Sequence, residues 1–201
     1  MLKKPAVEKD LDLVSLGEKL RQRRKELRLT LSDVANGAGL SVGFISQVER
    51  NITAPSLGSL ATIASVLDFP INAFLDGATK NEEVTRSVDR SKFGVPGLEV
   101  SYERISSSFA GSTIHSVIVH EPPGHRVEPI SHEGEEMFFI LSGEITVEVE
   151  GERSVLRTGD SVHFDSRRTH SIWNHTAGTT SILWCGTMDI FGDENPEPIH
   201  K

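Results

Sequence analysis

The hydrophobic residues of this chain change their spacing part-way along its length. In the first third they recur every three or four positions, as at Leu16 and Leu20, which is the period of an amphipathic helix. In the second half they alternate with polar residues, as at Ile145 and Val147, which is the period of a half-buried strand, and the Ser142–Gly143 pair between 137–141 and 144–150 predicts a hairpin. The two patterns are separated by a polar stretch punctuated by glycine and proline. We therefore expect an α + β chain of two domains: a helical domain at 12–76, a linker at 77–97 and an all-β domain at 98–192.

Charge is also divided unevenly between the two halves. The 201 residues carry 21 Lys and Arg against 29 Asp and Glu, a net charge of -8. Residues 1–78 have a net charge of +1, whereas residues 79–201 have a net charge of -9 and hold all eight histidines. An acidic chain does not coat nucleic acid by bulk charge. The basic run from Lys19 to Arg28 still allows a local DNA contact, although such a run is also typical of a solvated helix face.

The cysteine and apolar content exclude several other classes. The single Cys185 excludes a disulfide scaffold within the chain and a cysteine-based zinc finger. The charged first ten residues lack the apolar stretch of a secretory signal, and no apolar run approaches the ~20 residues of a membrane span. We expect a cytoplasmic protein with no membrane partner.

The helical part contains the signals for five short helices. Thr30, with an acidic residue three positions later, is typical of a capping box, and Ser41 can cap a helix over 42–50. A short fifth helix is expected at 71–75. Two short helices joined by a turn at Gly39 indicate a helix-turn-helix, whose second helix presents its first residues to the major groove.

These residues resemble the Xre/Cro-type, or lambda-repressor-like, DNA-binding domains. Four stretches match in the order and spacing of that family: 16–24, 29–35, 39–50 and 55–60. The resemblance implies a five-helix domain whose DNA contacts surround the start of the second motif helix. Carried over to this chain, the DNA-binding residues are Thr30, Ser41, Val42, Gly43, Ser46, Gln47, Arg50 and Asn51.

Two kinds of DNA contact are expected from this set. Gln47 can form two hydrogen bonds with adenine and Val42 can pack on a thymine methyl group, whereas the hydroxyl, arginine and asparagine side chains would contact phosphates. Leu31 stands where many members of the family have glutamine, so no contact is carried over to it. Glu49 is expected to pair with an arginine of the first helix, because a carboxylate facing phosphates would be repelled.

The second half resembles the cupins. The motif residues match in spacing at His132, Glu136, Gly143, Gly159, His170 and Asn174. The resemblance implies an RmlC-like jelly-roll barrel that acts as a sensor and dimerisation domain. Two departures are visible: Ile130 occupies the place of a metal-binding histidine, and Asp165 and Arg167 replace the usual proline and glycine.

Two interpretations of the cupin residues remain open. His132, Glu136 and His170 could hold a divalent metal such as Zn, Fe, Mn or Ni, with His125 or water completing the shell. The same three side chains could instead hydrogen-bond to one another in a metal-free cavity. A mostly apolar effector pocket is expected near three further residues, Arg126, Phe138 and Trp173. Arg126 would bind an anionic group of the effector.

The combination resembles Xre-family regulators with a C-terminal cupin sensor domain. We expect a sequence-specific transcriptional regulator without enzymatic activity, which reads an inverted repeat in double-stranded DNA as a homodimer and binds a small-molecule effector. The alternative is a metal-dependent cupin enzyme, of dioxygenase or isomerase type, with autoregulatory DNA binding. A third interpretation is a protein-interaction scaffold, for which Gln47→Ala would leave function unchanged.

Overall fold

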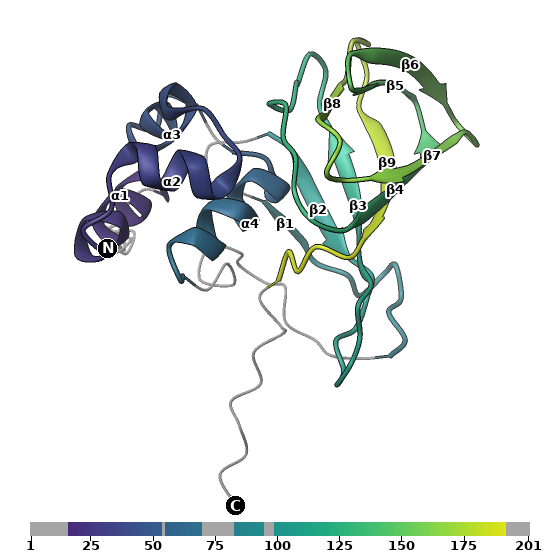
Figure 1. Ribbon diagram of the computed structural model, residues 1–201. Helices are drawn as coiled ribbons and strands as arrows, with labels where there is room; N and C mark the ends of the chain where they lie inside the picture. Colours follow the sequence, from purple (N-terminus) through teal and green to yellow (C-terminus); the bar gives the residue numbers. More distant parts are fainter. Residues whose placement is uncertain (1–15, 54, 70–82, 95–98, 192–201) are drawn as a thin grey trace, which may run out of the picture.

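The computed structural model describes residues 16–53, 55–69, 83–94 and 99–191. These residues form a helical unit followed by a β unit, and the last helix of the first lies beside the first strands of the second (Figure 1). Within the described ranges, no helix is both long enough and apolar enough to cross a bilayer.

Four helices form the described part of the helical unit, and the fifth expected helix, at 71–75, lies outside the described residues. Three of the helices begin at a capping hydroxyl, where the side chain accepts a backbone N–H that has no partner within the helix. Thr30 and Asp33 form the expected capping box, and Ser41 caps its helix as expected. The helices are α1 (Leu16–Glu26), α2 (Leu31–Ala38), α3 (Val42–Glu49) and α4 (Leu57–Val66).

The helices pack around a small apolar core, to which α1, α2, α3 and α4 each contribute buried aliphatic side chains. The closest approach is between α1 and α3 at Gly17, where an added Cβ would lie 2.2 Å from the Val48 carbonyl oxygen. The Gly17 N–H donates to Asn51 Oδ1 at 3.0 Å, just beyond the end of α3. Glycine at this position therefore allows α1 to lie against the backbone of α3.

The β unit consists of two antiparallel sheets. The larger sheet has the strand order β1-β2-β3-β9-β4-β7, and the smaller has the order β6-β5-β8. Buried aliphatic and aromatic side chains from both sheets fill the space between them, among them Ile140, Ile145 and Ile182. The strands are β1 (Lys92–Gly94), β2 (Ser101–Arg104), β3 (His115–Glu121), β4 (Glu135–Ser142), β5 (Glu144–Val149), β6 (Glu152–Arg157), β7 (Ser161–Asp165), β8 (His170–Trp173) and β9 (Thr180–Gly186).

The sheet begins earlier in the chain than the sequence indicated. β1 pairs with β2 in a register that places Phe93 opposite Tyr102, and their rings stack with centroids 5.6 Å apart. Residues 92–94 fall within the expected linker at 77–97, yet they form the edge of the larger sheet. The Phe93–Tyr102 pair stabilises this strand pairing in a segment whose local sequence is polar and rich in glycine.

The connection between β4 and β5 differs from the hairpin that alternation and the Ser142–Gly143 pair suggest. β4 pairs with β7 and β9, and β5 pairs with β6 and β8, so the two strands belong to different sheets. Gly143, with φ of 89°, takes the chain round the corner from one sheet to the other. The tight hairpin of this region is instead β5–β6, whose two turn residues, Glu150 and Gly151, both have positive φ, as a type I′ turn requires.

Candidate functional site

The start of α3 presents a solvent-exposed face. Val42, Gly43 and Gln47 are exposed and Ser46 is half-buried, whereas Phe44 on the opposite side is buried in the core. Val42 is 44% exposed. The expected base-reading residues therefore share one open surface of α3.

Three of the expected phosphate contacts have partners within the protein. The Thr30 hydroxyl donates to Asp33 Oδ2 at 2.7 Å, and the Ser41 hydroxyl accepts from Phe44 N at 3.1 Å. Asn51 Oδ1 accepts from Gly17 N. These contacts hold helix ends in place, and the Thr30 hydroxyl proton is already donated to Asp33. The fourth residue, Arg50, is exposed: its Nε donates to the Ser46 carbonyl oxygen, and its two terminal guanidinium nitrogens extend beyond this bond.

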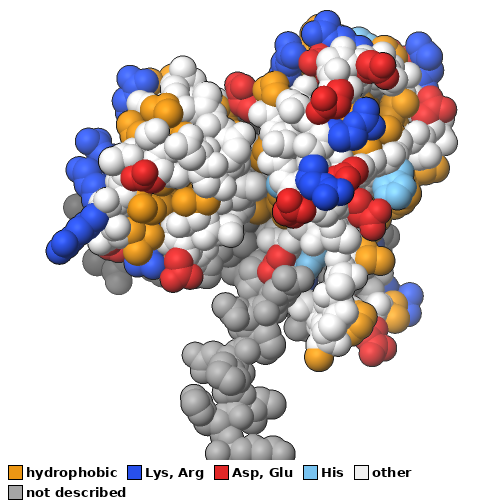
Figure 2. All heavy atoms as spheres, in the orientation of Figure 1, with side chains coloured by type: hydrophobic (Ala, Val, Ile, Leu, Met, Phe, Trp, Pro, Cys, Tyr) orange, Lys and Arg blue, Asp and Glu red, His pale blue; other side chains and the backbone are white. Residues whose placement is uncertain are grey.

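Arg24 and Glu49 form the ion pair expected between the first helix and the recognition helix. The Arg24 guanidinium donates to both carboxylate oxygens, at 2.5 Å from Nε and 2.9 Å from Nη2. The hydrogen bonds with Glu49 raise the pKa of Arg24 above its ordinary value. The expectation for Glu49 is thus confirmed, and its charge faces α1 and not the open surface. Figure 2 shows Lys and Arg side chains along the outer edge of the helical unit, where α1 lies, and others over the β unit.

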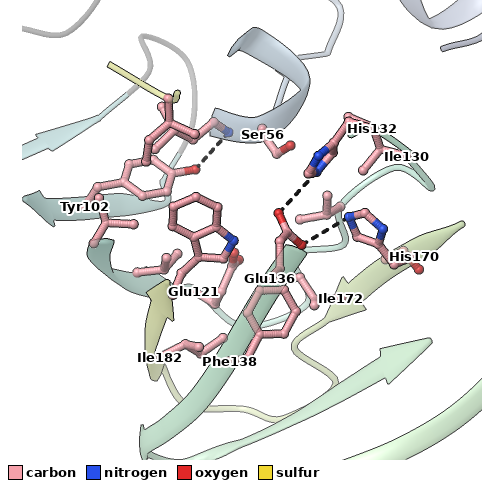
Figure 3. Close-up of a pocket in the computed structure, with 18 residues that line it drawn as sticks. Ser56, Tyr102, Glu121, Ile130, His132, Glu136, Phe138, His170, Ile172 and Ile182 are labelled. Atoms are coloured by element: carbon pink, nitrogen blue, oxygen red, sulfur yellow. Dashed lines mark hydrogen bonds and ion pairs between the residues drawn. The ribbon is translucent and has the colours of Figure 1, made fainter. Parts of the chain in front are cut away.

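His132, Glu136 and His170 converge at one end of a cavity in the β unit (Figure 3). Glu136 Oε1 lies 3.2 Å from His132 Nε2, and Glu136 Oε2 lies 3.2 Å from His170 Nε2. All three side chains are more than nine-tenths buried. Glu136 projects from β4, His170 from the start of β8 and His132 from the loop before β4.

The hydrogen bonds of the two imidazoles leave the same nitrogen facing this point. His132 Nδ1 lies 2.9 Å from the Glu133 carbonyl oxygen and His170 Nδ1 lies 2.8 Å from the Arg168 carbonyl oxygen. Because a carbonyl can only accept, each Nδ1 carries the proton, and each Nε2 points at Glu136. Metal-binding histidines are typically oriented by such a bond from the ring nitrogen that does not bind the metal.

The donor set therefore fits a divalent metal. Separations of about 3 Å suit neighbouring ligands of an ion with bonds of ~2.1 Å, and two imidazoles with one carboxylate suit Zn, Fe, Mn or Ni. Among the described residues the cluster has three members, because Ile130 is apolar and His125 is bonded to Glu121 elsewhere. A bound metal would keep open positions for water or another small ligand.

The carboxylate is also stabilised without a metal. Burial by itself would raise the pKa of Glu136, but the hydrogen bonds from His132 and His170 outweigh burial and lower that pKa to about 2. Burial lowers the pKa of His170, but the hydrogen bond to Glu136, the charge of Glu136 and the hydrogen bond to the Arg168 backbone together raise it more, so the net direction is upward. Glu136 is thus ionised in the metal-free protein too.

The cavity that this cluster faces is small and mostly apolar. Its volume is about 90 Å³, room for a few water molecules or one small organic molecule. Its wall includes Phe138, Ile172, Ile182 and Trp184, with the cluster on one side and Tyr102 and Glu121 on another (Figure 3). An apolar wall with a few convergent polar groups is typical of a small-molecule site.

Of the three residues expected in an effector pocket, Phe138 lines the cavity and the other two lie outside it. Arg126 is exposed and Trp173 is 40% exposed, with its ring against His175. The two residues face each other across an isolated bridge, and their neighbours Val127 and Ile172 line the cavity instead. Because side chains alternate across a strand, Arg126 and Trp173 point away from this cavity, one position along from the residues that line it.

The structure adds cavity residues that sequence reasoning missed. Tyr102 on β2 and Glu121 on β3 reach the cavity, and so do Ser56 and Leu57 at the start of α4. Strand alternation could have indicated that Tyr102 points inward, since its neighbours in the strand are polar. No local signal indicates that the helical unit borders the cavity, because the contact joins residues 45 positions apart.

The other described histidines have partners of their own. His120 lies 2.9 Å from Glu103 Oε1 and His163 lies 2.9 Å from Glu135 Oε2. His175 lies between Thr146 and Glu144. These three pairs lie outside the cluster of His132, Glu136 and His170.

Comparisons with known proteins agree with this division of the chain. A family profile described as a helix-turn-helix matches residues 20–74, and a profile described as a cupin domain matches residues 117–186. The chain thus combines an Xre-type helix-turn-helix domain with a cupin domain. It is 26% identical over 179 residues to the HTH-type transcriptional regulator PuuR of Escherichia coli, and the aligned region covers 87% of this chain and 96% of PuuR.

Two further similarities extend over most of the regulator. The HTH-type transcriptional regulator SutR of Escherichia coli is 24% identical over 160 residues, covering 77% of this chain and 84% of SutR. A crystal structure of an HTH_3 family transcriptional regulator from Vibrio cholerae matches with a TM-score of 0.54 and 20% identity, covering 86% of this chain and 94% of that one. This structural match shows that the two-domain fold is shared.

Proposed function

We propose that the protein is a cytoplasmic transcription factor that binds an inverted repeat in double-stranded DNA as a homodimer, and that a small molecule in the cupin cavity changes this binding. The observation that supports the DNA-binding half is the open face of α3, with Val42, Gly43 and Gln47 exposed and the opposite face in the core. A nearly neutral DNA-binding unit binds weakly alone, so two units reading half-sites one helical turn apart are expected. The proposed boundaries are 12–76 for the DNA-binding domain, 77–97 for the linker and 98–192 for the sensor and dimerisation domain.

The decisive experiment measures binding of the full chain to the DNA upstream of its own gene and to a scrambled fragment, at several salt concentrations. Gln47→Ala is expected to weaken binding to the upstream DNA by about 5- to 150-fold, the worth of one bidentate base contact. Gln22→Ala, on the exposed face of α1, is the matched control and is expected to change binding little. No preference for the upstream fragment at any salt concentration would exclude this function.

The end of the cavity that carries His132, Glu136 and His170 is proposed to hold a divalent metal. The effector is proposed to be a compact, largely apolar molecule with one polar group that contacts this end of the cavity. The supporting observation is the Nδ1–H bonds that aim both Nε2 atoms at Glu136. His170→Ala is expected to abolish stoichiometric metal binding. His163→Ala removes an exposed imidazole and is expected to leave it intact.

A metal-dependent enzyme of dioxygenase or isomerase type, with autoregulatory DNA binding, is the second candidate. The observation that favours it is the same three-residue cluster at the end of an apolar cavity, since such clusters also serve catalysis. The Ile130 side chain, where a fourth ligand would stand, counts against it. Metal content combined with turnover assays separates the two: a stoichiometric metal with measurable turnover favours the enzyme, and a metal that changes only DNA affinity favours the regulator.

A further inference from the structure

The helical unit forms part of the cavity wall. Ser56, Leu57 and Gly58, the cap and first two residues of α4, line the same cavity as His132, Glu136 and His170. Figure 3 shows Ser56 and its helix on the side of the cavity where His132 lies. The β unit by itself would therefore leave this side of the cavity open.

One buried hydrogen bond connects the units at this wall. The Leu57 N–H donates to the Tyr102 hydroxyl at 3.3 Å, and Tyr102 is itself a cavity residue, only 3% exposed. The Leu57 N–H belongs to the first turn of α4 and has no acceptor within the helix. The bond thus couples the position of α4 to a side chain that a cavity ligand would touch.

A second contact joins the helix-turn-helix motif to the loop that carries His132. Gly39, the C-cap residue of α2 with φ of 67°, lies so close to this loop that an added Cβ would be 3.0 Å from the Ser131 carbonyl oxygen. Ser131 directly precedes His132. Movement of the His132 loop would therefore press on the turn between α2 and α3.

We propose that the cavity is a site shared by both domains: the first turn of α4 closes it, and occupancy of His132, Glu136 and His170 is transmitted to the helix-turn-helix through the Leu57–Tyr102 and Gly39–Ser131 contacts of the same chain. This inference rests on the proposed function of the cavity but does not depend on DNA binding. A ligand can shift the position of the DNA-binding domain only if it interacts differently with its two arrangements, and these two contacts supply that difference.

The test follows backbone amide exchange, residue by residue, in the full chain with and without saturating Zn²⁺, with metal content measured on the same samples. In the unmodified protein Zn²⁺ is expected to slow exchange of the Leu57 and Leu40 amides severalfold, although neither lies in the β unit. In Tyr102→Phe the Leu57 amide is expected to exchange at least about tenfold faster, because it has lost its acceptor, and its response to Zn²⁺ is expected to disappear.

Two comparisons keep the test decisive. Ser116→Ala removes a buried hydroxyl that bonds Cys185, in the strand next to β2, and is expected to preserve both responses. Bound Zn²⁺ that alters exchange only around the three ligands would overturn the inference. Absence of bound Zn²⁺ would count against the proposed metal, and the exchange rate of the Leu57 amide in the metal-free protein then becomes the test. Faster exchange in Tyr102→Phe than in the unmodified protein supports the shared wall, and an unchanged rate overturns the inference.

Discussion

At the scale of single residues, α3 is held against α1 by a largely buried ion pair. Arg24 and Glu49 are largely buried, with side-chain exposures of 13% and 7%, and join through two parallel hydrogen bonds. Arg24 also donates to the Leu29 carbonyl oxygen, at the end of the turn that follows α1. One guanidinium thus positions both α3 and the chain that leads into α2.

This arrangement predicts strong coupling between the two side chains. Arg24→Ala and Glu49→Ala are each expected to destabilise the protein, because each leaves a partly buried charge without its partner. The double variant is expected to lose less than the sum of the two, with a coupling free energy of about 0.5–3 kcal/mol in chemical denaturation. Strict additivity would show that the pair contributes nothing beyond its separate side chains.

The residue types of the site were predictable from sequence, but the direction of individual side chains was less so. His132, Glu136 and His170 could be chosen because their spacing follows a family pattern, and the structure brings them together. Arg126 and Trp173 were placed in the pocket on chemical grounds alone. Their strand positions point them outward, a fact that depends on a register that local sequence does not specify.

At the scale of elements, a corner between the sheets shapes the β unit. Gly143 adopts φ of 89°, and an added Cβ would lie 2.7 Å from Thr180 Oγ1 and 3.0 Å from Thr180 Cα. Alternation located β4 and β5 correctly, and the Ser142–Gly143 pair located the turn. Alternation carries no information on whether two successive strands pair with each other, which is why a hairpin was expected where the chain changes sheets.

The corner predicts an asymmetry between two glycines. Gly143→Ala is expected to lower the free energy of unfolding by about 1–3 kcal/mol, because it combines an unfavourable positive φ with contact against backbone. Gly178→Ala is the control, since an added Cβ there meets nothing within 4 Å. Thermal or denaturant unfolding of both variants checks the prediction, and equal effects would contradict it.

A second prediction at this scale concerns β3 and the turn that follows it. Glu121 Oε2 lies 2.5 Å from His125 Nδ1, and this hydrogen bond raises the pKa of His125 above its ordinary value. A raised folded-state pKa stabilises the protein below the unfolded-state value of about 6.5, and the contribution is lost as pH rises through the folded-state pKa. The loss of unfolding free energy in His125→Gln is therefore expected to be larger at about pH 5.5 than at about pH 9.

Comparison of the variant with the unmodified protein at each pH isolates His125 from the other titrating groups. Asn174 donates a hydrogen bond to the backbone carbonyl oxygen of Glu121, and Tyr102 lies near the Glu121 carboxylate. Neither Asn174 nor Tyr102 should therefore be substituted in the same experiment. A loss that is the same at both pH values, or larger at high pH, would show that the pair does not stabilise the fold in this way.

At the scale of the whole molecule, the sequence indicated two domains but not how they meet. The periods of 3.6 and 2 separate the domains because each period reflects local burial. The contact of α4 with β2 depends on a hydroxyl and an amide far apart in the chain, and neither has a distinctive pattern around it. The cavity wall that α4 completes was for this reason outside the reach of sequence reasoning.

The division of charge predicts how DNA binding responds to salt. The acidic β unit should be repelled by phosphates, so that the contacts released by salt come from the helical unit alone. Arg50→Ala, at the end of α3, is expected to weaken binding to all sequences and to reduce the slope of log K against log salt by about 1. Arg153→Ala, at an exposed arginine on β6, is expected to leave the slope unchanged. Binding measured for both variants between about 50 and 200 mM salt checks this, and a reduced slope for Arg153→Ala would show that the cupin domain also lies on the DNA.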